Sequence, residues 1–337
     1  MNILADKIID LLRCPACGHD QLDFEAQNGS WAICDHCLEE FTIIDGIPFL
    51  CIGDIVDLIR RDGSESLGDE QDGNEIKRAN VIYHNEFAES YEQDVSTYDM
   101  FQDGGPCQQR LDGSLAGAAA RAGGGVLVDV CCGTGNVLSA AQEYFDTLLG
   151  IDLSTSMMKI ARGRGLEVLG GDATNLPIKD KSADCVTAFS ALHHVLDYEA
   201  MAAEMARILK PGGTFYSDWD PNGHVTHTGW AVSLATGTLK ALRRLTSKAN
   251  IPETPLQNLA EYHHHSEDGF DGKKIWTVLE KAGFSKVEVY YHINPPSFGK
   301  TSSWGLYGWF MAALKIVSFI APTSRKVLPY VAVVAVK

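Results

Sequence analysis

The chain has little that marks a secreted or membrane-spanning protein. Met1 to Leu12 contains Asp6 and Asp10, so it lacks the uninterrupted apolar core of a secretory signal. The most apolar stretch, SWGLYGWFMAALKIVSFIAP, is interrupted by Lys315 and lies near the lower length limit for a membrane span. We therefore expect a cytoplasmic protein in which this stretch covers a cavity or dips into a membrane interface.

Positive charge is also scarce, with 28 Lys and Arg against 44 Asp and Glu and a net charge of −16. Residues 1–80 hold 6 Lys and Arg against 17 Asp and Glu, so the negative charge is concentrated in the N-terminal part of the chain. Nucleic-acid binding draws most of its affinity from cations that neutralise phosphates, so this charge argues against nucleic acid as a partner. One segment, GWAVSLATGTLKALRRLTSK, is basic and free of acids. Its pattern predicts an amphipathic helix, which either binds an anionic surface or has an ordinary solvated outer face.

Four of the nine cysteines form two C-x-x-C pairs, Cys14 with Cys17 and Cys34 with Cys37. Two such turns facing each other offer the four thiolates of a tetrahedral zinc site. Two disulfides are the alternative, but they are disfavoured where no secretory signal is present. Four thiolates fill the coordination shell, so we expect a structural zinc that holds a fold together and does no chemistry.

The segment VLVDVCCGTGNV, from Val126 to Val137, has the pattern of a buried parallel strand followed by a glycine turn and a helix. Gly133 and Gly135 let the backbone approach a ligand closely, as nucleotide sites require. A dinucleotide fingerprint has a third glycine, but Leu138 stands in its place. A dehydrogenase is therefore the less favoured interpretation.

Further strand patterns follow in order, and acids stand at the ends of two of them. TLLGID ends at Asp152, LEVLGGDATNLP carries Asp172, and ADCVTAFSALHHV leads to the phrase ARILKPGGTFY. Doubly wound sheets bind ligands at the carboxyl ends of their strands, so acids at these ends favour a nucleotide-like ligand over simple turn or cap roles.

From Tyr83 to Lys337 these ordered motifs resemble the class I S-adenosylmethionine-dependent methyltransferases, especially the branch with the ubiquinone and menaquinone C-methyltransferases. The resemblance implies an α/β fold with a Rossmann-like sheet of seven strands, parallel except for one. It also implies S-adenosylmethionine as cofactor. Helices before the first strand cover the cofactor in this family, and Tyr83 and Tyr91 are candidates for its methionine end.

The resemblance also implies site roles. Asp129 reaches the ammonium of S-adenosylmethionine, with Gly133 and Gly135 around its amino-acid end, and Asp152 takes the ribose diol. The adenine ring contacts the remaining three: Met157 on its face, Asp172 at its amino group and the backbone of Ala173 at its border. Cys131 and Cys132 lie inside this turn, and we interpret them as packing residues.

The run around the four cysteines, through DGIPFL, resembles a small zinc-ribbon protein that partners several tRNA and translation-factor methyltransferases. We therefore expect a zinc-ribbon module at 1–53, an acidic linker at 54–80 and a methyltransferase domain at 81–337. Two insertions in that domain, 221–271 and 294–329, are expected to form a lid.

The main functional hypothesis is methyl transfer to an apolar or amphipathic small molecule, such as a quinone, polyketide, terpenoid or lipid. The alternative is an RNA or translation-factor methyltransferase that uses the zinc module for substrate or partner binding. A non-catalytic adaptor is disfavoured because the cofactor motifs are intact. His194, Asp220 and His224 are candidates for a catalytic base, although the LHHV phrase suggests a cavity-wall role for His194.

Overall fold

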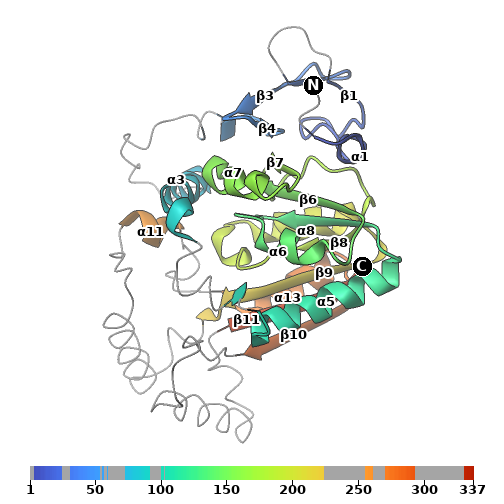
Figure 1. The fold of residues 1–337 in the computed structure, drawn as a ribbon, viewed down its shortest axis with the longest axis vertical. Helices are drawn as coiled ribbons and strands as arrows, with labels where there is room; N and C mark the ends of the chain where they lie inside the picture. Colours follow the sequence, from blue (N-terminus) through green and yellow to red (C-terminus); the bar gives the residue numbers. More distant parts are fainter. Residues whose placement is uncertain are drawn as a thin grey trace, which may run out of the picture.

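The structure is a computed structural model. It describes residues 4–24, 31–53, 55–56, 59, 73–91, 100–101, 103–223, 255–260, 270–292 and 330–337. Their strands form one sheet in the order β1-β2-β3-β4-β7-β6-β5-β8-β9-β11-β10, which Figure 1 shows running from the N-terminal strands at the top to β10 at the bottom.

The expected seven-stranded methyltransferase sheet is present, from β7 to β10 in that order. The parallel strands β5 (Val126–Val130), β6 (Thr147–Asp152), β7 (Val168–Gly170), β8 (Ala183–Thr187) and β9 (Leu209–Pro221) form its centre. β11 (Tyr330–Val336) runs antiparallel between β9 and β10 (Lys286–His292). The sequence therefore predicted both the fold class and the one reversed strand correctly.

Helices cover both faces of this sheet. One face carries α5 (Pro106–Ala122), α6 (Asn136–Ala141) and α7 (Thr155–Gly163), and the other carries α8 (Tyr198–Ile208) and α13 (Gly272–Lys281). Asp197 caps α8 by accepting a hydrogen bond from the Ala200 backbone nitrogen at 2.9 Å. Helix α8 ends at Ile208, because Pro211 disfavours helical geometry at Lys210, and β9 already starts at Leu209.

The cysteine module, defined here as residues 4–24 and 31–53, extends the same sheet. It contains α1 (Asp6–Ile9) and the short strands β1 (Leu22–Asp23), β2 (Ala32–Cys34), β3 (Glu40–Ile44) and β4 (Ile47–Phe49). β4 pairs in parallel with β7 where Phe49 lies opposite Gly170, and the Leu50 nitrogen donates to the Gly170 carbonyl at 2.9 Å. A Cβ on Gly170 would lie 2.0 Å from the Phe49 ring, so only glycine admits this contact.

The apolar residues of the module are shared between the two faces of the methyltransferase sheet. Ile8, Leu12 and Leu50 belong to the buried cluster that includes the β6 and β8 residues under α8. Phe49 and Ile47 belong to the other cluster, with residues of α5, α6 and α7. The module therefore has no separate apolar core among the described residues.

Helix α3 (Gly73–Tyr91) packs on α7 and on the short helix α11 (Pro255–Ala260). It begins at Gly73, inside the range 54–80 that the sequence assigned to the linker. In the described part of the chain, no helix is long and apolar enough to cross a membrane. The expected lid at 294–329 lies outside the described residues, as does most of 221–271.

Candidate active site and metal centre

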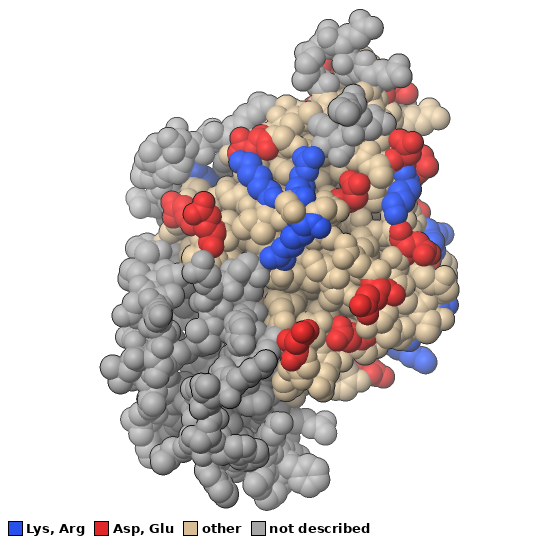
Figure 2. All heavy atoms as spheres, in the orientation of Figure 1, with Lys and Arg blue, Asp and Glu red and all other residues tan. Residues whose placement is uncertain are grey.

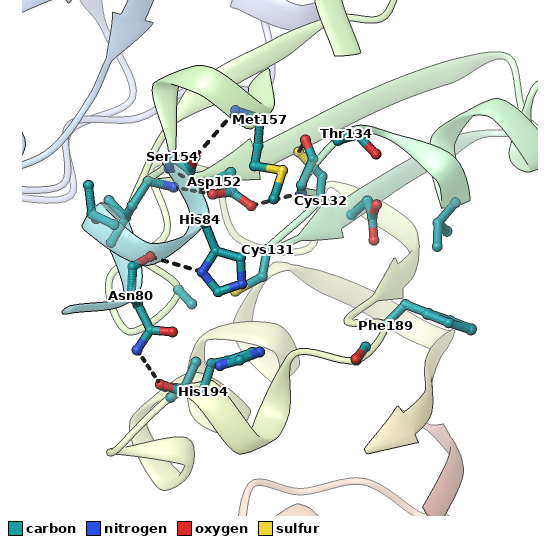
Figure 3. A pocket seen from close by; sticks show the side chains of 18 of the residues that line it. Asn80, His84, Cys131, Cys132, Thr134, Asp152, Ser154, Met157, Phe189 and His194 are labelled. Atoms are coloured by element: carbon teal, nitrogen blue, oxygen red, sulfur yellow. Dashed lines mark hydrogen bonds between the residues drawn. The ribbon is translucent and has the colours of Figure 1, made fainter. Parts of the chain in front are cut away.

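A pocket opens at the carboxyl ends of β5, β6 and β7, beneath α3 (Figure 3). Six of the seven residues predicted to hold the cofactor line this pocket, and they lie at or after the ends of β5, β6 and β7: Asp129, Gly133, Asp152, Met157, Asp172 and Ala173. Gly135 lies in the same turn but outside the lining. The pocket thus lies at the carboxyl ends of the strands, where the sequence analysis predicted the ligand site.

Asp129 is the most unusual group in the pocket. Its side chain is 1% exposed, and Oδ1 accepts a hydrogen bond from the Thr187 hydroxyl at 2.6 Å. Oδ2 is buried and has no hydrogen-bond partner among the described residues. Burial raises the pKa of Asp129 to about 7, although the Thr187 hydrogen bond acts in the opposite direction. A cationic ligand group would both satisfy Oδ2 and favour the charged carboxylate.

The glycine turn and Asp152 form one hydrogen-bonded unit. Asp152 Oδ2 accepts from the Gly133 nitrogen at 2.8 Å, and Oδ1 accepts from the Leu153 and Ser154 nitrogens. Gly135 has φ +80°, and a Cβ there would lie 2.4 Å from a Leu166 methyl carbon. The turn is therefore closed to larger residues, and the Asp152 carboxylate is fixed in place with acceptor capacity left on Oδ2.

Asp172 follows β7 and carries an ion pair that sequence reasoning missed. Lys77 Nζ on α3 donates to Asp172 Oδ2 at 2.6 Å, while the Thr174 nitrogen and hydroxyl donate to Oδ1. The Cys51 thiol of the cysteine module is buried beside Asp172, and burial and this neighbouring carboxylate raise its pKa. Three separate parts of the chain thus meet at Asp172: α3, the end of β7 and the cysteine module.

Helix α3 supplies a second set of pocket residues that the sequence analysis did not name, namely Lys77, Asn80, Val81 and His84. Asn85 fastens α3 to α7, because its Oδ1 accepts from the Ser154 hydroxyl at 2.8 Å and the Ser156 nitrogen at 2.9 Å. Their positions in the sequence offered a signal for this set. They are three or four residues apart, and this spacing puts them on one face of a helix. Tyr91, which the sequence did name, also lines the pocket, whereas Tyr83 does not.

The three catalytic candidates lie in different places. His194, on the short helix η1 (Leu192–His194), lines the pocket, and its Nδ1 donates to the Ala260 carbonyl at 2.9 Å. Asp220 is buried behind that wall, 2.9 Å from His193 Nδ1, and accepts from the Ser217 hydroxyl. Burial raises the pKa of Asp220 to about 7. His224 lies outside the described residues.

Asp218 is another buried carboxylate, and charged and polar side chains surround it. Arg110 Nε donates to it at 2.8 Å, and His292 and the Tyr216 hydroxyl also contact it. Burial raises the pKa of Asp218, but the hydrogen bonds and charges of His292 and Arg110 outweigh burial and lower it overall. This cluster joins α5 to the β9 and β10 strands and supports the sheet beside the pocket.

Cys131 and Cys132 are free thiols in the pocket wall. Burial and the nearby Asp152 carboxylate raise the pKa of both far above the ordinary value for cysteine. They are therefore protonated packing residues rather than reactive thiolates.

The four module cysteines converge, and their sulfur atoms all lie within 4.8 Å of one another. Cys14 and Cys37 are 3.6 Å apart, as are Cys17 and Cys34. Tetrahedral Zn–S bonds of about 2.3 Å would separate sulfur atoms by roughly 3.8 Å. The geometry and the soft donor set fit a tetrahedral metal such as zinc.

Comparison with known proteins supports the same class of enzyme. A family profile described as "Methyltransferase domain" matches residues 128–217. A demethylmenaquinone methyltransferase of Staphylococcus saprophyticus is 37% identical over 180 residues, which cover 49% of this chain and 72% of that protein. The chain belongs to the class I S-adenosylmethionine-dependent methyltransferase family.

Other relatives of this methyltransferase include the phthiotriol/phenolphthiotriol dimycocerosates methyltransferase of Mycobacterium tuberculosis, 32% identical over 38% of this chain and 50% of that protein. Among solved structures, a SAM-dependent methyltransferase from Archaeoglobus fulgidus aligns over 76% of this chain and 100% of that one. Its TM-score is 0.45 and its identity 16%. Membership of the family confirms the predicted enzyme class and S-adenosylmethionine as methyl donor, while the individual residue roles stay predictions.

Proposed function

We propose that this methyltransferase acts on an apolar or amphipathic small molecule that carries a ring hydroxyl, of the quinol or phenolic-lipid type. The observation that carries this proposal is the similarity to demethylmenaquinone methyltransferase over most of that protein's length. The chain's acidic charge agrees with an acceptor that is not nucleic acid.

The pocket wall supports an apolar acceptor. Phe101 and Phe189 lie with ring centroids 5.2 Å apart, and both line the pocket together with Tyr91, Val195 and Leu196. Leu196 is 37% exposed, so it offers apolar surface at the pocket mouth. Aromatic and aliphatic walls of this kind stabilise a ring by removing apolar area from water.

Within this proposal the cofactor lies along the three strand ends. Asp129 Oδ2 binds the ammonium, Gly133 and Gly135 surround the amino-acid end, and Asp152 accepts the ribose hydroxyls. Met157, Asp172 and Ala173 contact adenine. When bound, S-adenosylmethionine supplies a methyl group on a positively charged sulfur. The chain's part is to hold the acceptor in line with that methyl and to exclude water.

We further propose that Cys14, Cys17, Cys34 and Cys37 hold a structural zinc ion, which fixes the turns that precede β1 and β3. Fixed turns position β4 beside β7, next to the adenine-binding residues. The insertions at 221–271 and 294–329 are proposed to close over the acceptor, with their basic and apolar segments giving peripheral contact with lipid.

The test is to supply methyl-labelled S-adenosylmethionine to cell extract and follow the label. We expect it in the lipid fraction, and in a 2-prenyl-1,4-naphthohydroquinone offered to the purified protein under reducing conditions. The double variant Trp309→Ala with Phe310→Ala removes apolar area from the second insertion but no cation. It should weaken acceptor binding and leave cofactor binding intact. Label in RNA at an unchanged rate in that variant would contradict the proposal.

A further inference from the structure

One pocket side chain has no part in the cofactor assignments above. His84 projects from α3 into the pocket, and Figure 3 shows its ring extending from the helix between Asp152 and His194. The side chain is half-buried, and its ring centroid lies 5.0 Å from that of His194 with the rings nearly perpendicular, at 86°. His84 is thus held by packing at the middle of the pocket.

The hydrogen bond of His84 determines which ring nitrogen carries hydrogen. Nδ1 lies 2.9 Å from the Asn80 carbonyl oxygen, one helical turn earlier on α3. A carbonyl oxygen only accepts, so Nδ1 must be the donor. In the neutral imidazole Nε2 then has a lone pair, and Figure 3 shows that nitrogen on the side of the ring away from Asn80, inside the pocket. A lone pair on a fixed imidazole is the group that accepts a proton in general base catalysis.

The position suits proton transfer from the acceptor. The strand order β7-β6-β5 places Asp152, at the end of β6, between Asp129 on β5 and Asp172 after β7 along the edge of the pocket. If these acids bind the ammonium, the adenine and the ribose, the methyl-bearing sulfur lies near the middle, which is where the ring of His84 points. The apolar wall of Phe101 and Phe189 also belongs to this pocket, so an acceptor ring on that wall brings its hydroxyl within the same space.

We propose that His84 is the general base of methyl transfer. This inference rests on the proposed function, because it needs an acceptor with an ionisable ring hydroxyl. Nε2 takes the hydroxyl proton, and the oxygen's electron density moves to the neighbouring ring carbon. That carbon forms the new bond to the methyl group while the carbon–sulfur bond breaks and its electron pair stays on sulfur. The ring carbon then loses its hydrogen as a proton and the oxygen is reprotonated by His84, so one proton is released overall.

Other titratable groups line the same pocket as His84 and come from several elements around it. They are Lys77 and Tyr91 on α3, Asp129, Cys131 and Cys132 at the end of β5, Asp152 after β6, Asp172 after β7, and His194 on η1. Tyr83, the preceding residue on α3, also contacts its ring. His194 is the alternative base, because its Nδ1 likewise donates to a carbonyl oxygen, that of Ala260.

The first test uses activity with the reduced 2-prenyl-1,4-naphthohydroquinone. His84→Gln should lower kcat/KM by about 10²- to 10⁴-fold, the usual contribution of a general base, and change S-adenosylmethionine affinity by less than about threefold. The acid pH limb of kcat/KM should disappear in this variant. Added imidazole should partly rescue His84→Ala. Loss of activity and of that pH limb in His194→Gln but not in His84→Gln would overturn the proposal.

The second test needs no turnover and therefore separates this inference from the choice of acceptor. In nitrogen-15 NMR of histidine-labelled protein, one imidazole with hydrogen on Nδ1 should disappear in His84→Gln, while the signal of His194, whose Nδ1 also donates, should remain. The Nε2 signal of His84 should shift when 1,4-naphthohydroquinone is added. A spectrum with His84 hydrogen on Nε2, or without response to the hydroquinone, refutes the base role. Absence of methyl transfer by the unsubstituted protein, with the expected spectrum, refutes only the proposed acceptor.

Discussion

The cysteine module and the methyltransferase sheet bury apolar residues in different ways. The strands β5 to β9 lie between two layers of helices, and their side chains fill a core on each face. The module has strands of two to five residues, and its large apolar side chains enter those same two cores. A segment this short cannot bury enough surface by itself, so it depends on a metal, on a neighbour or on both.

A second difference concerns the buried acids. In the methyltransferase core, Asp218 is surrounded by Arg110, His292 and Tyr216, whereas Asp129 has one oxygen without a partner among the described residues. The first arrangement favours the charged carboxylate and the second disfavours it. Among the described residues, the pocket thus has a buried acid with one unsatisfied oxygen, whereas the buried acid of the adjoining sheet is satisfied.

The largest effect is expected from removal of the proposed zinc. Cys34→Ser should lose the ion and unfold the module, because metal binding to such sites contributes about 10 kcal/mol or more to folding in small zinc domains. Metal analysis and circular dichroism would measure the change. Cys51→Ser is the matched control, since that buried thiol is outside the cluster and its variant should keep the metal. Full occupancy in Cys34→Ser would contradict the assignment.

The next effect concerns the contact between module and sheet. Phe49→Ala should cost about 3 to 5 kcal/mol of unfolding free energy, because the ring is fully buried against Gly170. It should also weaken S-adenosylmethionine binding, since Asp172 follows directly on β7. Denaturant titration and calorimetry measure the two effects. Leu38→Ala, at a side chain 72% exposed in the same module, should change stability by no more than about 0.5 kcal/mol.

Asp129 allows a test of pH dependence. Its pKa is about 7 in the folded protein against about 3.9 in model peptides, so the folded state binds more protons between these values. Stability contributed by the neutral acid is therefore present at low pH and lost as pH rises through 7.

The ammonium of S-adenosylmethionine needs the charged form, so cofactor affinity should rise between pH 5 and 7, by at most about tenfold per unit. Asp129→Asn should remove this dependence and weaken binding at pH 7 by about tenfold or more. Isothermal calorimetry at three pH values measures both. An unchanged slope in Asp129→Asn would show that another group is responsible.

The smallest effect is expected at the module surface. Lys159 on α7 pairs with Asp45 in the β3–β4 turn at 2.9 Å, and the neighbouring Arg162 donates to the Gly46 carbonyl. Figure 2 shows blue Lys and Arg side chains gathered in the region of α7, below the N-terminal strands. Both partners of the Lys159 pair are about half exposed, so Lys159→Ala should cost about 0.2 to 1 kcal/mol, and less in high salt. A loss as large as that of Phe49→Ala would mean that charge, not burial, joins the two regions.

The sequence predicted best what is local and repeated. Glycine turns, strand-end acids and paired cysteines are short patterns with strict physical requirements, and the structure brings Asp129, Asp152 and Asp172 to one pocket. The sequence could not predict that Phe49 contacts Gly170, because the partner of an edge strand is set by tertiary packing. The family resemblance placed the helix before the first strand over the cofactor, but the sequence did not identify Lys77, Asn80 or His84 as pocket residues, since an amphipathic pattern does not state what each face contacts.

The pairing of Phe49 with Gly170 also has a consequence for the order of synthesis. The ribosome makes the cysteine module first, yet β7 follows 121 residues later in the chain. At usual elongation rates of 5 to 20 residues per second, roughly 6 to 25 s pass before β7 is made. During this time the backbone N–H and C=O groups on the β7 side of β4 have no strand to pair with. An open strand edge beside an exposed Phe49 invites pairing with other nascent chains. Early metal capture and the acidic charges of the module would limit such pairing until β7 emerges.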